Sequence, residues 1–272
     1  MAIITLLTDF GTQDEYVGVV KGVILGINPG ATLVDISHHV PPQGVQQAGD
    51  MLKTAFGWFP QGTVHLAVVD PGVGSRRAIL VARHAGHLFV APDNGLLSLI
   101  WGDQPPEAVV RVENSRLFLH PVSATFQARD MLAPVAAHLS LGMAIKTIGP
   151  SMDFSQAVRI VRRRAQQTED GEIIGEVVSA DRFGNLRTNI DAALLDRLRG
   201  GDARRILVVR IGTYQIEGMS SHYAQSETGG LMALVGSRNQ LEVAVNGGSA
   251  LDLFPEFLGL EVRVRMEPRT ND

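Results

Sequence analysis

The sequence predicts an α/β N-terminal domain with a largely parallel sheet, followed by a smaller all-β, barrel-like C-terminal domain. In the first half, apolar segments of strand length alternate with segments of helical periodicity, which is typical of α/β layers. In the second half nearly every apolar segment is strand-like. A polar stretch, "RRAQQTEDG" (163–171), separates the halves, so we expect domains at 1–163 and 172–272 with a linker at 164–171.

The expected strands of the first half are nearly continuous apolar runs, as found in sheets covered on both faces. They are residues 3–7, 32–36, 64–69, 78–82 and 87–91.

Helical segments lie between and after these strands. Residues 14–27 place apolar side chains at steps of three and four, with Thr12 or Asp14 as the candidate N-cap. Residues 44–57 and 130–142 are also expected to be helical, with Pro134 tolerated in a first turn.

In the second half, strands are expected at 172–180, 205–211, 241–246 and 260–266, and the only helical signal is a short piece near 191–199.

Composition excludes several classes of protein. The net charge of −4 provides no basic field for a nucleic-acid partner. No apolar stretch approaches the roughly 20 residues of a membrane span, and the N-terminus reads as a first strand rather than a signal peptide. Cysteine is absent, which agrees with the cytoplasmic location that we expect.

Motifs narrow the chemistry further. The eight histidines lack metal-ligand spacing, so no catalytic metal is expected. Neither a G-x-G-x-x-G after a strand nor a P-loop occurs, which argues against a dinucleotide or a nucleoside triphosphate. The absence of G-x-S-x-G argues against a serine hydrolase with a nucleophile elbow.

Polar residues follow three of the expected strands. These are Asp9, Asp70, and the pair Asp93 and Asn94. Each group alone could be turn chemistry, because turns favour Asp, Asn and Gly. Ligands bind beyond the carboxyl ends of strands in open α/β sheets, so three such groups favour a shared pocket. A carboxylate such as Asp9 suits a vicinal diol such as ribose.

Further polar residues have both structural and functional interpretations. Asp130 could cap a helix or pair with Arg129. Phe183 and Asn185 could bind a purine or form a hairpin turn. Ser237 and Arg238 could bind a carboxylate or form a surface ion pair.

Six stretches in fixed order carry a family resemblance. They are "LLTDFGTQDEYVGVVKGVI", "VVDPGVGSRR", "FVAPDNGLL", "TFQARDMLAPVAAHLS", "DRFGNLRTNI" and "GSRNQLEVAVNGGSA". The sequence resembles the S-adenosylmethionine (SAM) hydroxide adenosyltransferases, also called SAM hydrolases, which are relatives of the fluorinating and chlorinating adenosyl transferases.

The resemblance implies SAM as substrate rather than cofactor, with water attacking C5′ to give adenosine and L-methionine. It implies a homotrimer whose sites lie between the N-terminal domain of one subunit and the C-terminal domain of its neighbour. It assigns the ribose hydroxyls to Asp9, the adenine to Phe183 and Asn185, and the methionine ammonium to Asp181. It assigns the methionine carboxylate to Ser237 and Arg238.

The resemblance also implies an Asp-Arg-His set around the attacking water. Asp70 and Arg77 match its first two members, but Gln127 stands where the family motif T-F-H-G-R-D has histidine. An amide can orient water through its carbonyl oxygen but cannot accept a proton near neutral pH. The halogenating relatives carry tyrosine in place of the acid, and a carboxylate would repel a halide ion. We therefore expect a hydrolase, with a catalytically impaired SAM- or adenosine-binding protein and a halide adenosyl transferase as the alternatives.

Overall fold

The computed structural model describes residues 2–200 and 204–269, and the chain divides into two compact units, Met1–Val161 and Arg162–Asp272. The segment expected to be a linker, 164–171, contains β7 (Gln166–Gln167), which pairs with β8 (Ile173–Ala180). Part of that segment therefore belongs to the sheet of the second unit.

The first unit is built on a mixed sheet. Among its described residues, six strands lie in the order β2-β1-β3-β5-β4-β6. They are β1 (Ile3–Thr8), β2 (Thr32–Ser37), β3 (Val64–Val68), β4 (Ile79–His84), β5 (His87–Pro92) and β6 (Ala108–Arg111). β1, β2, β3 and β5 pair in parallel, whereas β4 is antiparallel to β5 and β6. The predicted largely parallel sheet is confirmed.

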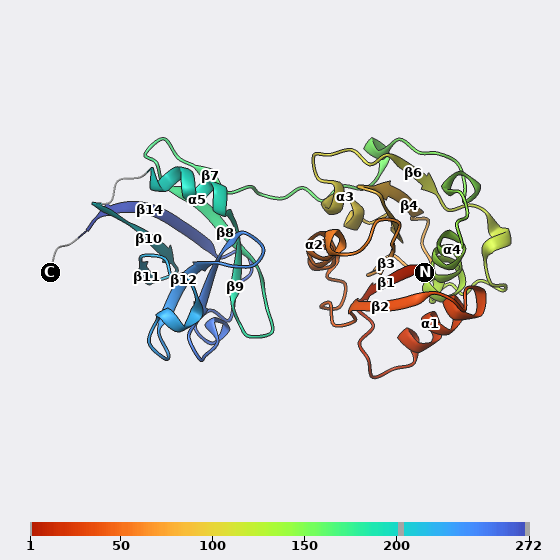
Figure 1. The fold of residues 1–272 in the computed structure, drawn as a ribbon, viewed down its shortest axis with the longest axis horizontal. Coiled ribbons are helices and arrows are strands. Elements are labelled where there is room, and N and C mark those ends of the chain that lie inside the picture. The colour runs from red at the N-terminus through yellow and green to blue at the C-terminus, as the bar shows by residue number, and fades with distance from the viewer. Residues whose placement is uncertain (1, 201–203, 270–272) are drawn as a thin grey trace. The chain divides into compact units, whose positions relative to one another are not determined.

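Helices cover both faces of this sheet, which explains the continuous apolar strands. α1 (Tyr16–Ile27) packs with α4 (Ala133–Ser140), and α2 (Val45–Ala55) packs with α3 (Leu96–Trp101). Figure 1 shows the two pairs on opposite sides of the strands. Neighbouring residues of one strand therefore enter different cores: Leu6 joins the core of α1 and α4, and Leu7 that of α2 and α3.

Some sequence-based expectations for the first unit were wrong in detail. Neither Thr12 nor Asp14 caps α1, because the helix begins after Glu15, whose side chain makes no capping bond. The short elements α3 and β6 were not predicted from the sequence. The segment expected to be helical at 130–142 begins as a π-helical turn, η3 (Ala128–Leu132), before α4.

The second unit is an antiparallel, nearly closed barrel-like sheet, as predicted. In its described part the strand order is β11-β10-β14-β8-β9-β13-β12. The remaining strands are β9 (Leu186–Asp191), β10 (Arg205–Ile211), β11 (Tyr214–Glu217), β12 (Leu231–Val235), β13 (Gln240–Val245) and β14 (Glu261–Pro268). The amide of Ser220, just after β11, donates to Ala233 O in β12 at 2.8 Å and so bridges the two ends of the sheet. α5 (Ala192–Arg199) follows β9, as expected.

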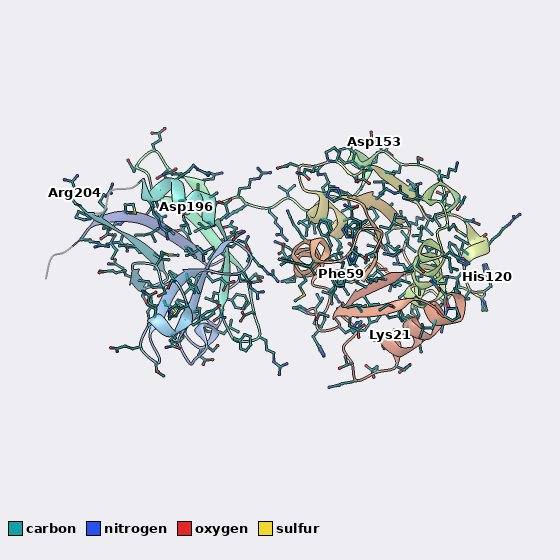
Figure 2. All side chains as sticks on the ribbon, viewed as in Figure 1. Lys21, Phe59, His120, Asp153, Asp196 and Arg204 are labelled. Carbon is teal, nitrogen blue, oxygen red and sulfur yellow. The ribbon has the colours of Figure 1, made fainter. Side chains whose placement is uncertain are left out.

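Histidines gather at the amino edge of the parallel strands in the first unit. His65 in β3 is fully buried, and its Nδ1 lies 2.7 Å from Thr5 Oγ1 while its Nε2 lies 3.2 Å from His87 Nδ1. Phe59, labelled in Figure 2, packs edge-on against His65 with the ring centroids 5.7 Å apart. Burial, and then the neighbouring His87, lower the pKa of His65 to about 3. His65 is therefore a neutral core residue at physiological pH.

In the part of the chain that the structure describes, no helix is both long and apolar enough to cross a lipid bilayer.

Candidate active site

Strand order explains why an aspartate and an arginine meet at the carboxyl edge of the sheet. Asp70 follows β3 and Arg77 precedes β4, and these two strands flank β5. Because β4 is antiparallel to β5, the connection that leaves the sheet after β3 re-enters it at the same edge. The sequence "VDPGVGSRR" therefore returns a guanidinium to the carboxylate where the loop began.

The ion pair between Asp70 and Arg77 is close and largely buried. Arg77 Nε donates to both carboxylate oxygens, at 2.8 and 2.9 Å, and Nη2 donates to Oδ2 as well. The side chains are only 10% (Arg77) and 6% (Asp70) exposed. Arg77 Nη2 also donates to Gln127 Oε1 at 2.6 Å. One guanidinium thus holds both the acid and the amide that replaces the family histidine, and charge-assisted bonds of this kind fix orientation strongly.

The turn after β5 supports both ends of this loop. Asn94 Nδ2 donates to Val69 O at 2.7 Å, next to Asp70, and the Asp93 amide donates to Ala78 O at 2.9 Å, next to Arg77. Asp93 and Asn94 therefore hold the backbone from which the acid and the guanidinium project.

Gly74 lets the same loop approach a second segment. Its φ of +78° suits glycine, and an added Cβ would lie only 2.4 Å from Ala124 O. Gln127 lies three residues beyond this contact, so the close approach helps to bring the two segments together.

Asp130 anchors the segment that carries Gln127. It is 2% exposed, and its Oδ2 accepts from the Ser123 amide at 2.7 Å. Arg129 Nε donates to Oδ1 at 2.6 Å, and this bond is the main cause that lowers the pKa of Asp130. Of the two interpretations of Asp130, the structure has the pair with Arg129 rather than a helix cap.

A cavity of about 560 Å³ lies beside these groups within the first unit. Asp9, Asp70 and Gln127 all line it. Asp9 follows β1, and its Oδ2 accepts from the Gln43 amide at 2.8 Å. Of the predicted shared pocket, Asp9 and Asp70 are therefore confirmed together with Gln127, whereas Asp93 and Asn94 are not among the lining residues and instead support the loop. The cavity has a size that suits small-molecule ligands.

One wall of the cavity is aromatic. Tyr16 lies edge-on to Phe126 with centroids 5.1 Å apart, and Phe10 lies 6.2 Å from Phe126. The Arg129 guanidinium lies 5.2 Å from the centre of the Phe126 ring. This wall was not predicted, because aromatic residues dispersed over two segments carry no spacing signal.

The predicted residues of the second domain occupy two turns of the second unit. Asp181 Oδ1 accepts from the amides of Phe183, at 2.9 Å, and Asn185, at 3.0 Å, and Asn185 Nδ2 donates to Asp181 Oδ2 at 3.0 Å. Phe183 is 76% exposed, so its ring is available to a ligand. Ser237 is exposed and Arg238 half-buried in the turn between β12 and β13.

The sequence did not indicate several side chains that lie next to these turns, among them Glu242 and Tyr223. Glu242 is 4% exposed in β13, where "LEVAV" suggests an ordinary outward-facing strand acid. Tyr223 donates its hydroxyl to Glu242 at 3.2 Å across nineteen residues of sequence, and no local pattern reveals such a contact.

Among residues 2–200 and 204–269, no group of three or more His, Cys, Asp and Glu side chains is placed to hold a metal ion.

Taken together, the fold and these residues define a two-domain protein whose pocket, at the carboxyl edge of an α/β sheet, combines acidic and aromatic side chains. Comparison with known proteins identifies the family. Residues 4–149 match the family model described as "SAM hydroxide adenosyltransferase N-terminal domain", and residues 175–263 match the model of the corresponding C-terminal domain. The chain belongs to this family.

Its relatives include named hydrolases and a halogenating enzyme. The chain is 37% identical to an (R)-S-adenosyl-L-methionine hydrolase of Thermus thermophilus, over 95% of this chain and 97% of that protein. It is 38% identical to a hydrolase of the same name from Salinispora tropica, over 96% and 97%. A fluorinase of Nocardia brasiliensis is more distant, at 27% identity over 97% of each chain.

A solved structure supports the fold of the whole chain. An uncharacterized conserved protein from Thermotoga maritima has a TM-score of 0.89 and 36% identity, with 96% of this chain and 99% of that chain covered.

Proposed function

We propose that the protein hydrolyses S-adenosyl-L-methionine by in-line attack of water at C5′, giving adenosine and L-methionine. The observation that carries the proposal is the buried contact of Asp70, Arg77 and Gln127 at the edge of a ligand-sized cavity. Membership of a family whose 34–38% identical relatives are named hydrolases supports the same reaction.

The proposed reaction forms one bond and breaks one. The water oxygen bonds to C5′ while the C5′–S bond breaks, and its electron pair returns to sulfur. The sulfonium becomes the neutral thioether of methionine, so the leaving group needs no general acid. One water proton must be removed, and Asp70 is its proposed acceptor. Placing water in line with the breaking bond supplies much of the acceleration in reactions of this kind.

Arg77 and Gln127 are assigned to positioning. Arg77 remains protonated and therefore cannot be the base. Gln127 turns its carbonyl oxygen to Arg77, and this contact fixes the guanidinium and the amide against each other. The carbonyl that was expected to orient water is thus already bonded, and the N–H donors of the amide become the better candidates for a contact with water.

The remaining assignments place the parts of the substrate. Asp9 would hold the ribose hydroxyls, Phe183 and Asn185 the adenine, and Asp181 the methionine ammonium. Ser237 and Arg238 would hold the methionine carboxylate. We further propose a homotrimer with sites between subunits, a cytoplasmic location, and SAM as substrate with no cofactor or metal. Sedimentation or light scattering tests the trimer directly.

The experiment incubates purified protein with SAM and follows adenosine and methionine by chromatography and mass spectrometry. Hydrolysis predicts that both products accumulate in equal amounts. Tight binding without product over hours would instead favour the impaired binding protein, the alternative motivated by Gln127. Parallel reactions with chloride or fluoride test the third possibility, since a halide adenosyl transferase would yield halogenated adenosine.

A further inference from the structure

A largely buried ionic cluster, formed by Asp181, Arg187 and Glu242, lies beside the two proposed binding turns of the second unit. Arg187 in β9 is directly opposite Glu242 in the antiparallel pairing with β13. Arg187 Nε lies 3.7 Å from Glu242 Oε1, and Arg187 Nη2 lies 3.5 Å from Asp181 Oδ2. The Glu242 side chain is 5% exposed and that of Arg187 is 17% exposed. One cation is therefore shared between two acids.

The contacts of this cation are long. Arg187 Nε is buried and has no hydrogen-bond partner among the described residues. Arg187 Nη2 makes one long hydrogen bond to Asp181 Oδ2, at 3.5 Å, so the attraction between Arg187 and Glu242 is chiefly coulombic. At these distances such attraction remains strong in a poorly solvated site.

Glu242 is held firmly from its other sides. Tyr223 donates its hydroxyl to Glu242 Oε2 at 3.2 Å. Burial, followed by the charge of Glu242, raises the pKa of Tyr223, so the phenol keeps its proton and remains a donor. The carboxylate also fills the space beside Gly236, where an added Cβ would lie 2.1 Å from Glu242 Oε1. Gly236 immediately precedes the turn of Ser237 and Arg238.

We propose that Glu242 is a specificity-determining residue that offsets the charge of Arg187 and leaves the Asp181 site with one net negative charge. Asp181 and Glu242 contribute two negative charges and Arg187 one positive charge. Without Glu242, the guanidinium would neutralise Asp181 and compete with an incoming cation. The class of ligand that this balance favours is one bearing a single ammonium group near Asp181. The inference rests on the proposed function and explains how its substrate is distinguished from adenosine.

The test measures binding by calorimetry in an Asp70→Asn background, which slows consumption of SAM under the proposed mechanism. The probes are SAM, adenosine, and a sulfonium analogue of SAM that lacks the α-amino group. Glu242→Gln keeps the shape and removes the charge. It should weaken SAM binding at least tenfold and change the affinity for adenosine and for the deaminated analogue less than twofold.

Two further variants separate charge from structure. The double variant Arg187→Gln, Glu242→Gln restores one net negative charge, so it should recover the preference for SAM over the deaminated analogue. Glu217→Gln removes an exposed acid in β11, whose Oε1 accepts from Gln215 at 3.3 Å, and should change no affinity.

Equal loss of affinity for all three probes in Glu242→Gln would mean a structural role and would overturn the inference. Failure of the double variant to recover the preference would do the same. If the unmodified protein hydrolyses SAM while Glu242→Gln binds it normally, this inference fails and the proposed function stands. If the unmodified protein neither binds nor hydrolyses SAM, both fail.

Discussion

Replacing Arg77 by lysine tests whether the guanidinium acts through its geometry or only through its charge. Arg77 Nε contacts both oxygens of Asp70, and Nη2 contacts Asp70 and Gln127 together. A lysine ammonium is a compact point charge without the planar fork. It can keep an ion pair with Asp70 but cannot hold the carboxylate in two-point contact while also reaching Gln127.

The size of the effect follows from the hydrogen bonds that lysine cannot make. A hydrogen bond involving a charged group contributes about 1.5–3 kcal/mol. Little solvent is available to replace it, because Arg77 is 10% exposed and Asp70 6% exposed. If the loss of one such bond falls on the transition state, kcat/KM should drop about 10- to 150-fold.

The assay is the initial rate of adenosine release over a range of SAM concentrations. Arg76→Lys is the matched control, because Arg76 is the adjacent residue of the same loop and is exposed. The control should differ from the parent less than twofold, and the melting temperature of both variants verifies folding. An Arg77→Lys enzyme as fast as the control would refute the geometric role of the guanidinium.

Three other outcomes are expected. Gln127→His should raise kcat, because imidazole can accept a proton and general-base assistance contributes about 10²–10⁴-fold. Initial rates measure the change, and no gain would mean that Asp70 alone suffices as the proton acceptor. Asn94→Asp removes the hydrogen bond to Val69 O, which supports the backbone next to Asp70, and should lower kcat/KM about 3- to 10-fold. Unchanged kinetics would mean that this hydrogen bond does not contribute to catalysis. The free energy of unfolding should fall as the pH drops from about 6.5 toward about 3. Over this range His65 is protonated in the unfolded chain but stays neutral in the folded protein, where it is buried. His65 should contribute about 1.4 kcal/mol per pH unit to this loss of stability, which urea unfolding at about pH 7 and about pH 5 measures. The variant His65→Gln should show a weaker pH dependence. An equally strong pH dependence in this variant would contradict the assignment to His65.

The sequence predicted the fold where periodicity was strong. Continuous apolar runs became β1, β3 and β5, and the amphipathic segment at 44–57 became α2 and the short helix η1 (Phe56–Trp58) after it. α3 and β12 escaped prediction because they are short and lie next to glycine-rich turns. The predicted N-cap of α1 was wrong because Glu15, already in the αR conformation, precedes the helix, and its side chain makes no capping hydrogen bond.

The candidate site was predictable only in part. Asp9 and Asp70 could be selected because each follows an expected strand, and topology then brings those strand ends to one edge, whereas Arg77 came from the family motif. Gln127 came from the family motif, and the sequence offered no sign that it bonds to Arg77. Glu242, Arg187 and Tyr223 depend on cross-strand register and on a loop contact, neither of which appears in local spacing.

The central claim is that the carboxylate of Asp70, held by Arg77, directs water at C5′ and takes its proton. The most direct measurement is the single-turnover rate of Asp70→Asn with bound SAM, compared with the parent at equal occupancy. Asparagine keeps the shape of the side chain but cannot accept the proton, so the rate should fall by about 10²-fold or more while SAM still binds. A bound substrate that Asp70→Asn hydrolyses as fast as the parent would contradict the account.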